Sequence, residues 1–102
     1  MKSLTPQEFD ALGPSVALVD VREPVELAEV RTDRAQSMPM STFLEHLDEL
    51  PDQPIYLLCH SGSRSARVAA YLEQQGYDAV NIAGGIVEWE AVGLPVVRSV
   101  VE

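Results

Sequence analysis

The sequence predicts an α/β domain built around a mostly parallel sheet. Short apolar runs rich in β-branched residues alternate along the chain with helical patterns, which is the order expected of strands joined by crossover helices. The chain has 102 residues, which is enough for one domain and too few for two. Its hydrophobic fraction of 46% is ordinary for a globular protein. We therefore expect one domain with a hydrophobic core over residues 1–102.

The first elements follow from signals at their ends. The segment "TPQEF" predicts a helix start, with Thr5 as N-cap, Pro6 at the first helical position and Glu8 closing a capping box. The segment "VALVDVR" (16–22) is short, mostly apolar and ends in polar residues, which is typical of a buried strand. The segment "EPVELAEV" then predicts a short helix, because Pro24 suits a first helical turn.

The middle of the chain gives weaker signals. The segment "RTDRAQSMPM" has little periodicity and predicts a loop with a brief strand near 37–38. The segment "STFLEHLDEL" predicts a helix that starts with a second capping box, formed by Thr42 and Glu45. Pro51 and Pro54 bracket the turn that follows it. The expected apolar stripe of this helix consists of Phe43, Leu44, Leu47 and Leu50.

The second half repeats the alternation of strands and helices. The segment "IYLLC" (55–59) predicts a second buried strand, and "DAVNI" (78–82) predicts a third. The helix between them ends near Gly76, which suits a left-handed C-terminal cap. A last short helix is expected between Gly85 and Gly93. The predicted buried face of the helix after the second strand consists of Val68, Ala69, Tyr71 and Leu72.

Charge and composition exclude several classes of function. The net charge is −9, from 16 acidic and 7 basic side chains, so we expect no nucleic-acid or membrane partner. The same sign opposes long-range attraction of small anions, so an anion site must depend on local dipoles and a few arginines. A single cysteine cannot form an internal disulfide. The start of the chain does not resemble a signal peptide, and no apolar segment approaches the ~20 residues that span a bilayer. We therefore expect a cytoplasmic protein.

The single cysteine, Cys59, lies where a predicted strand ends and a helix is about to begin. Ligands of open parallel sheets bind beyond the carboxyl ends of the strands, and Asp20 also lies at such an end. Gly62 can adopt backbone angles that other residues avoid. The turn is otherwise made of small polar residues that include Ser61, Ser63 and Ser65.

Such a turn would favour a reactive form of the thiol. Consecutive main-chain N–H groups can form an anion-binding nest, and the N-terminus of a helix adds about half a positive charge. Both effects lower the pKa of a cysteine and favour the nucleophilic thiolate. Arg64 adds a permanent cation at the mouth of the turn. The alternative is an inert, buried cysteine that merely ends a strand.

Three motifs resemble the rhodanese (thiosulfate sulfurtransferase) domain family. The segment "CHSGSRS" is similar to the active-site loop of that family: a cysteine, four residues, an arginine, and then Ser or Thr. The segment "LVDVREPVEL" is similar to its first strand and acidic helix, and "AVNIAGGIVEWEAVGLPVV" to its closing motif. The motifs reach from about Leu18 to Val97. The resemblance implies a single rhodanese-like domain, whose sheet of about five parallel strands has helices on both faces.

The resemblance also implies a chemistry. A donor such as thiosulfate would pass its sulfane sulfur to Cys59, and the Cys59 persulfide would pass it to cyanide or a thiol, with no metal or organic cofactor. Asp20 and Arg22 would support the loop by hydrogen bonds from the strand end. Arg64 would either bind the sulfonate end of the donor or brace the loop through a carboxylate. The active-site loop and substrate-binding residues would be His60, Ser61, Gly62, Ser63, Arg64 and Ser65.

Two alternatives remain open at the level of sequence. The domain could be a non-catalytic or sulfur-shuttling module for a protein partner, and its negative charge would suit a basic one. It could also be a cysteine-dependent phosphatase or arsenate reductase, although those enzymes place five residues between Cys and Arg and this chain has four. The segment "EVRTDRAQSMPM" departs from the family, because the usual glycines and proline are absent. Donor preference therefore stays open around residues 30–37.

Overall fold

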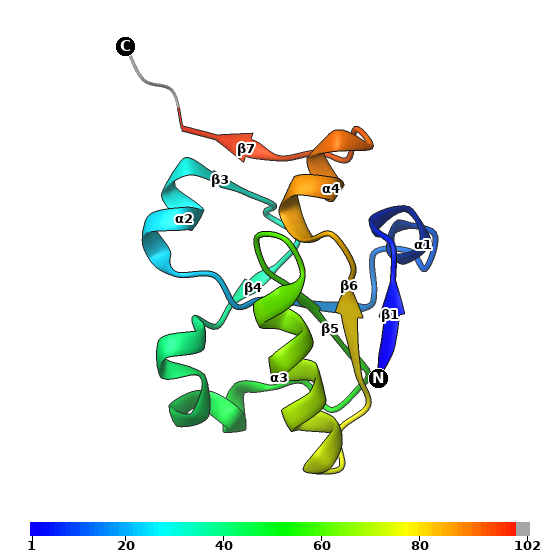
Figure 1. Cartoon of the computed structure of the whole chain (residues 1–102), viewed down its shortest axis with the longest axis vertical. Helices are drawn as coiled ribbons and strands as arrows, with labels where there is room; N and C mark the ends of the chain where they lie inside the picture. The colour runs from blue at the N-terminus through cyan, green and yellow to red at the C-terminus, as the bar shows by residue number, and fades with distance from the viewer. Residues whose placement is uncertain (100–102) are drawn as a thin grey trace.

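A parallel sheet of five strands forms the centre of the molecule, as expected (Figure 1). In the computed structural model, which describes residues 1–99, the strands lie in the order β1-β6-β5-β2-β4. Because β5 is the middle strand and pairs in parallel with β2 and β6, its carboxyl end lies at the centre of the ligand-binding edge. The strands are β1 (Lys2–Leu4), β2 (Ala17–Asp20), β4 (Gln36–Ser37), β5 (Ile55–Leu58) and β6 (Ala79–Ile82).

Two strand pairings are not predicted by the sequence. The edge strand β1 has three residues, of which only Leu4 is even partly buried, so its pattern is too short to read. A separate two-stranded antiparallel sheet joins β3 (Val30–Arg31) to β7 (Val97–Arg98). Both members of that pair have two residues and a polar side chain each. Their pairing depends on tertiary contacts that sequence periodicity does not contain.

In the described part of the chain, four α-helices and one 3₁₀ helix surround the sheet. The longest α-helix has 12 residues, and within residues 1–99 no helix is long and apolar enough to cross a membrane. The predicted capping box at the first helix is present, because Glu8 N–H donates to Thr5 Oγ1 and Thr5 N–H donates to the Glu8 carboxylate. The helices are α1 (Pro6–Asp10), α2 (Pro24–Glu29), η1 (Met40–Glu49), α3 (Ser63–Gln74) and α4 (Gly85–Ala91).

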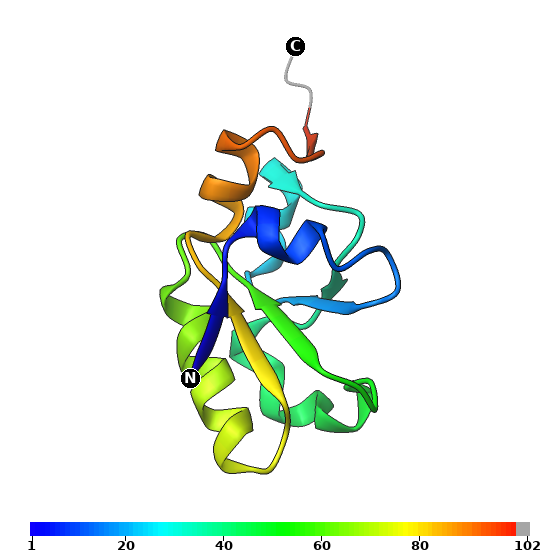
Figure 2. The ribbon, with the colours of Figure 1, turned by 90° about the vertical axis from the view of Figure 1, so that its right-hand side faces the viewer.

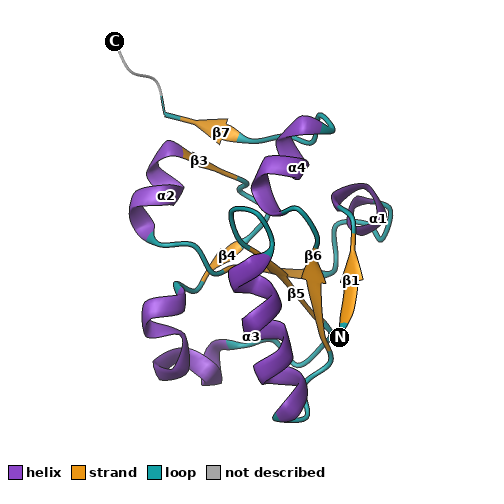
Figure 3. Cartoon of the chain, viewed as in Figure 1, coloured by secondary structure: helices purple, strands orange, loops and turns teal. Residues whose placement is uncertain are grey.

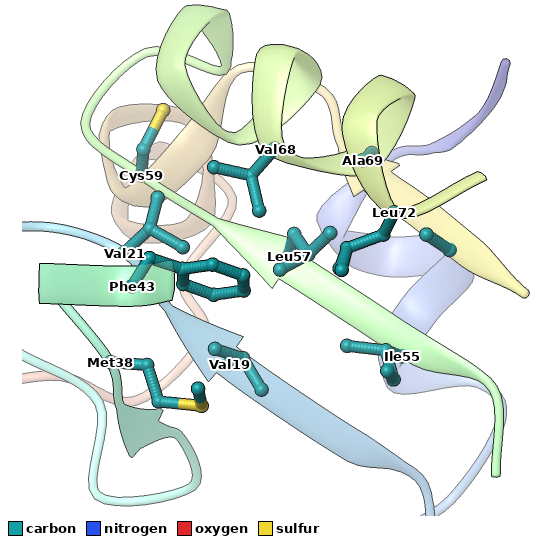
Figure 4. Packing of buried hydrophobic residues seen from close by; sticks show 11 residues of the cluster. Val19, Val21, Met38, Phe43, Ile55, Leu57, Cys59, Val68, Ala69 and Leu72 are labelled. Carbon is teal, nitrogen blue, oxygen red and sulfur yellow. The ribbon is translucent and has the colours of Figure 1, made fainter. Parts of the chain in front are cut away.

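Helices cover both faces of the sheet, as expected. On one face, side chains of α3 and η1 pack on Val19 and Leu57 of the central strands (Figure 4). Figure 2 shows α3, in yellow-green, on one side of the strands. On the opposite face, Phe9 of α1 and Trp89 of α4 pack on Leu58. Leu57 and Leu58 point to opposite faces of the sheet, because successive side chains of a strand alternate between its two faces.

The predicted helix at residues 41–50 differs from the structure at its start. The segment forms a 3₁₀ helix that already begins at Met40, behind Pro39, so Thr42 lies inside it and the expected capping box with Glu45 is wrong. The entry is instead fixed by the main chain, because Met40 N–H donates to the Val21 carbonyl at 2.9 Å.

Two apolar side chains expected in buried stripes are exposed. Leu44 of η1 is 63% exposed, and Tyr71 of α3 is 37% exposed. The buried face of α3 is centred on Ser65, Ala69 and Leu72, so Tyr71 lies on its flank. The expected cap at Gly76 is present with a φ of +92°.

Candidate active site

Cys59 lies immediately after the central strand β5, at the base of the loop that leads into α3 (Figure 3). Its side chain is fully buried. In Figure 4 the sulfur atom points away from Leu57 and toward this loop. The topology thus places the only cysteine of the chain at the middle of the sheet edge where parallel α/β domains bind their ligands.

Gly62 turns the loop back onto the sulfur. It has a φ of +100°, a region that L side chains rarely adopt. Its N–H donates a hydrogen bond to Cys59 Sγ at 3.1 Å. A Cβ at this position would lie 3.0 Å from the main-chain nitrogen of Gly84. The sequence prediction that Gly62 adopts a special backbone conformation is confirmed.

The start of α4 holds the carbonyl groups of the loop. Ile86 N–H donates to the Cys59 carbonyl at 2.9 Å, and Val87 N–H donates to the His60 carbonyl at 3.2 Å. Gly85 allows this approach, because a Cβ there would lie 2.4 Å from the His60 oxygen and 2.5 Å from the Cys59 oxygen. With these carbonyls engaged by α4, loop N–H groups are free to face the sulfur.

Ser65 supplies the second hydrogen bond to the sulfur. Its hydroxyl lies 3.2 Å from Cys59 Sγ and 2.5 Å from Asn81 Oδ1. Ser65 is fully buried and Asn81 is 6% exposed. The loop motif contains Ser65, but no sequence motif singles out Asn81. The available signal is a polar amide within the buried strand "AVNI", because a buried polar side chain needs a partner.

The surroundings of Cys59 favour the thiolate over the neutral thiol. Burial disfavours the thiolate and raises the pKa of Cys59, but hydrogen bonds from the Ser65 hydroxyl and from the N–H groups of Ser65, Gly62 and Arg64 outweigh it. The net effect lowers the pKa of Cys59 below the ordinary value for a thiol. These donors and the N-terminus of α3 favour negative charge on the sulfur.

Arg64 braces the loop against α2. Its guanidinium donates two hydrogen bonds to the Glu26 carboxylate, at 2.7 and 2.8 Å. The Arg64 side chain lowers the pKa of Glu26 to about 2. Of the two roles considered for Arg64 from the sequence, the structure shows the contact with a carboxylate.

Asp20 and Arg22 form a buried ion pair at the end of β2. Arg22 Nη2 lies 2.9 Å from the Asp20 carboxylate, with both side chains at most 2% exposed. The same guanidinium donates to the carbonyls of Glu26 and Val30 at the end of α2. Within residues 1–99 their hydrogen bonds join β2 to α2, and the expected bonds from Asp20 and Arg22 to the cysteine loop are not found. Their side chains therefore reach the loop through α2, which carries Glu26.

The remaining loop residues line the outside of the site. His60, Ser61 and Ser63 are exposed, and the exposure of His60 is as expected from the sequence. Within the described residues, no cluster of three His, Cys, Asp or Glu side chains could hold a metal ion. The site thus presents one sulfur, surrounded by main-chain and hydroxyl donors, with an arginine engaged at its rim.

The chain is similar in sequence and structure to known proteins of one family. The model of a family described as Rhodanese-like domain matches residues 5–92. A sulfurtransferase of Allochromatium vinosum is 43% identical over 84 residues, which cover 80% of this chain and 78% of that protein. A crystal structure of a rhodanese-like domain protein from Staphylococcus aureus is 37% identical, with a TM-score of 0.84, over 97% of this chain and 100% of the other.

A further relative contains a similar domain within a longer chain. It is the Mycobacterium tuberculosis protein named "Probable adenylyltransferase/sulfurtransferase MoeZ", which is 44% identical over 94 residues. The match covers 85% of this chain and 24% of that protein. Domains similar to this chain therefore occur both alone and as parts of larger proteins.

Proposed function

The chain belongs to the rhodanese-like domain family, and from this we propose that it transfers sulfane sulfur through a persulfide on Cys59. The family and the relative named sulfurtransferase support the sulfur-transfer role. The observation that carries the persulfide is the pair of donors on one buried sulfur, Gly62 N–H at 3.1 Å and the Ser65 hydroxyl at 3.2 Å. Such donors stabilise a sulfur anion.

In the first half-reaction, the Cys59 thiolate attacks the outer sulfur of a donor such as thiosulfate. A new S–S bond forms to Cys59 while the S–S bond of the donor breaks. Sulfite leaves with the bonding electron pair, so a persulfide anion remains on Cys59 and no external oxidant is needed. The N–H groups of the loop and the N-terminus of α3 would stabilise that anion.

In the second half-reaction, an acceptor takes the terminal sulfur. Cyanide or a thiolate attacks the outer sulfur of the persulfide, the S–S bond to Cys59 breaks, and the Cys59 thiolate is regenerated. With cyanide the product is thiocyanate. Because the first product leaves before the acceptor reacts, the kinetics should be ping-pong.

Intact-mass measurement tests this proposal directly. After treatment with thiosulfate, the protein should gain the mass of one sulfur atom, and cyanide should remove it. Cys59→Ser should gain nothing while keeping its fold, as checked by circular dichroism. An adduct on Cys59→Ser, or no adduct on the wild type with any persulfide or thiosulfonate donor, would contradict the proposal.

A second candidate is a sulfur carrier for a protein partner. The relative in which a similar domain forms 24% of a longer sulfurtransferase favours it. The ion pair of Arg64 supports it too. The Arg64 guanidinium donates to the Glu26 carboxylate at 2.7 and 2.8 Å, so it is not available to bind the sulfonate group of a small donor. A carrier would be loaded by a protein persulfide far faster than by thiosulfate. Comparing the two loading rates by mass spectrometry separates the candidates.

The phosphatase alternative has less support. Four residues separate Cys59 from Arg64, and the short loop closes on a single sulfur through Gly62. Hydrolysis of an aryl phosphate that is lost in Cys59→Ser would restore this alternative.

A further inference from the structure

The hydroxyl of Ser65 lies between two buried groups that both compete for its proton. Its oxygen is 3.2 Å from Cys59 Sγ and 2.5 Å from Asn81 Oδ1. A serine hydroxyl has one proton to donate and can accept at its oxygen. It therefore cannot donate to the sulfur and to the amide at the same time, and one of the two contacts must run in the opposite direction.

The protonation state of the sulfur decides the direction. A thiolate has no proton and can only accept, so Ser65 must donate to it, and Asn81 must then present its NH₂ group to the Ser65 oxygen. A neutral thiol can donate to Ser65, and Ser65 then donates to the Asn81 carbonyl oxygen. The two ends of an asparagine amide have nearly the same shape, so both arrangements fit the same packing.

We propose that Asn81 is a positioning residue, whose amide turns with the ionisation of Cys59 and directs the Ser65 hydroxyl at the thiolate. The chain Asn81 N–H to Ser65 O–H to sulfur would strengthen both hydrogen bonds, because each polarises the next. This inference deepens the proposed function, since it concerns how the nucleophile is held. Its test does not require sulfur transfer, so the two can fail separately.

Few other charged groups lie near Cys59 and could change its ionisation. Arg64 carries the charge that acts on Cys59 from α3, and Glu26 of α2 neutralises it. The Asp20–Arg22 pair at the end of β2 is internally balanced. Among the described loop residues, His60 is the remaining titratable group, and it is exposed.

The chain offers a direct readout, because Asn81 is its only asparagine. Protein labelled with ¹⁵N at the asparagine side chain should show a single NH₂ group by NMR. We expect its proton shifts to change with pH, at the midpoint found for Cys59 from the pH dependence of its alkylation rate. In Cys59→Ser the same signal should not titrate. A wild-type amide signal that stays constant while Cys59 ionises would overturn the proposal.

Variants separate positioning from a structural role. Ser65→Ala should raise the midpoint of Cys59 alkylation and leave the Asn81 signal insensitive to pH. Ser15→Ala is the matched control, because Ser15 is an exposed serine outside the cysteine loop, and it should change neither. Asn81→Leu should raise the same midpoint and slow alkylation at neutral pH several-fold. If Asn81→Leu lowers only the melting temperature and leaves the midpoint unchanged, Asn81 is merely structural and the proposal is wrong.

Discussion

Gly85 controls the candidate site although it is not expected to touch substrate. Its φ is +58°, and a Cβ would lie within 2.5 Å of the carbonyl oxygens of both Cys59 and His60. Those carbonyls are backbone atoms and cannot move aside without opening the loop. One glycine in α4 therefore determines how closely this helix can approach the cysteine loop.

We predict that Gly85→Ala destabilises the protein by about 2 kcal/mol or more, from backbone strain plus the steric clash. Sulfur loading of Cys59 should fall with it. Gly13→Ala is the matched control, because Gly13 has a φ of +92° but a Cβ there would have nothing within 4 Å; strain alone should cost about 1 kcal/mol at that position. Urea denaturation measures both, and equal losses would show that the clash is absent.

The thiol itself should make stability depend on pH. The pKa of Cys59 is lowered in the folded protein from the ordinary value of a thiol, which the unfolded chain retains. Between the two values the unfolded chain binds more protons, so the free energy of unfolding rises with pH. This contribution is complete above the unfolded pKa and is lost as the pH falls through the folded one.

We therefore expect the stability difference between wild type and Cys59→Ser to shift in favour of the wild type as the pH rises from 6 to about 9.5. Urea unfolding midpoints at several pH values measure it. A difference that stays constant over this range would mean that the folded thiol has an ordinary pKa.

At the scale of elements, α2 acts as a brace between β2 and the loop. The Asp20–Arg22 pair holds its C-terminal carbonyls, and Glu26 holds Arg64. Because the pKa of Glu26 is lowered to about 2, its contribution is present above the unfolded value of about 4.3. It is lost as the pH falls toward the folded value.

Glu26→Gln should therefore destabilise the protein by about 1 kcal/mol at pH 7, and the loss should shrink as the pH approaches about 2. Glu8→Gln is the control, because Glu8 closes a capping box as Glu26 does but within residues 1–99 has no arginine partner. Unfolding curves at pH 7 and pH 3 measure both variants. A larger loss for Glu8→Gln would show that the ion pair contributes nothing.

The sequence predicts the elements that carry strong local signals. An apolar run, a glycine turn and a helical pattern suffice to place Cys59 between β5 and α3. The start of η1 is missed, because Pro39 and a main-chain bond to Val21 set it. Asn81 is missed because its role depends on Ser65, a residue 16 positions away.

At the scale of the whole molecule, charge should govern the choice of donor. The net charge is −9, and the guanidinium of Arg64 is already paired with the Glu26 carboxylate. Thiosulfate carries two negative charges, whereas methanethiosulfonate has a similar sulfonyl group and one. Encounter between like charges is slowed, and salt screens the repulsion. The second-order rate of Cys59 loading should therefore rise with ionic strength, and more steeply for thiosulfate.

The variants used for stability also test this prediction. Glu26→Gln removes one negative charge and frees Arg64, so at low salt it should raise loading by thiosulfate several-fold more than loading by methanethiosulfonate. Glu8→Gln removes the same charge from α1, on the opposite face of the sheet from α3, and should change the ratio of the two rates little. Stopped-flow mixing with mass detection gives both rates. Loading by thiosulfate that falls with added salt would show net attraction, and Arg64 would then be free to bind the donor despite Glu26.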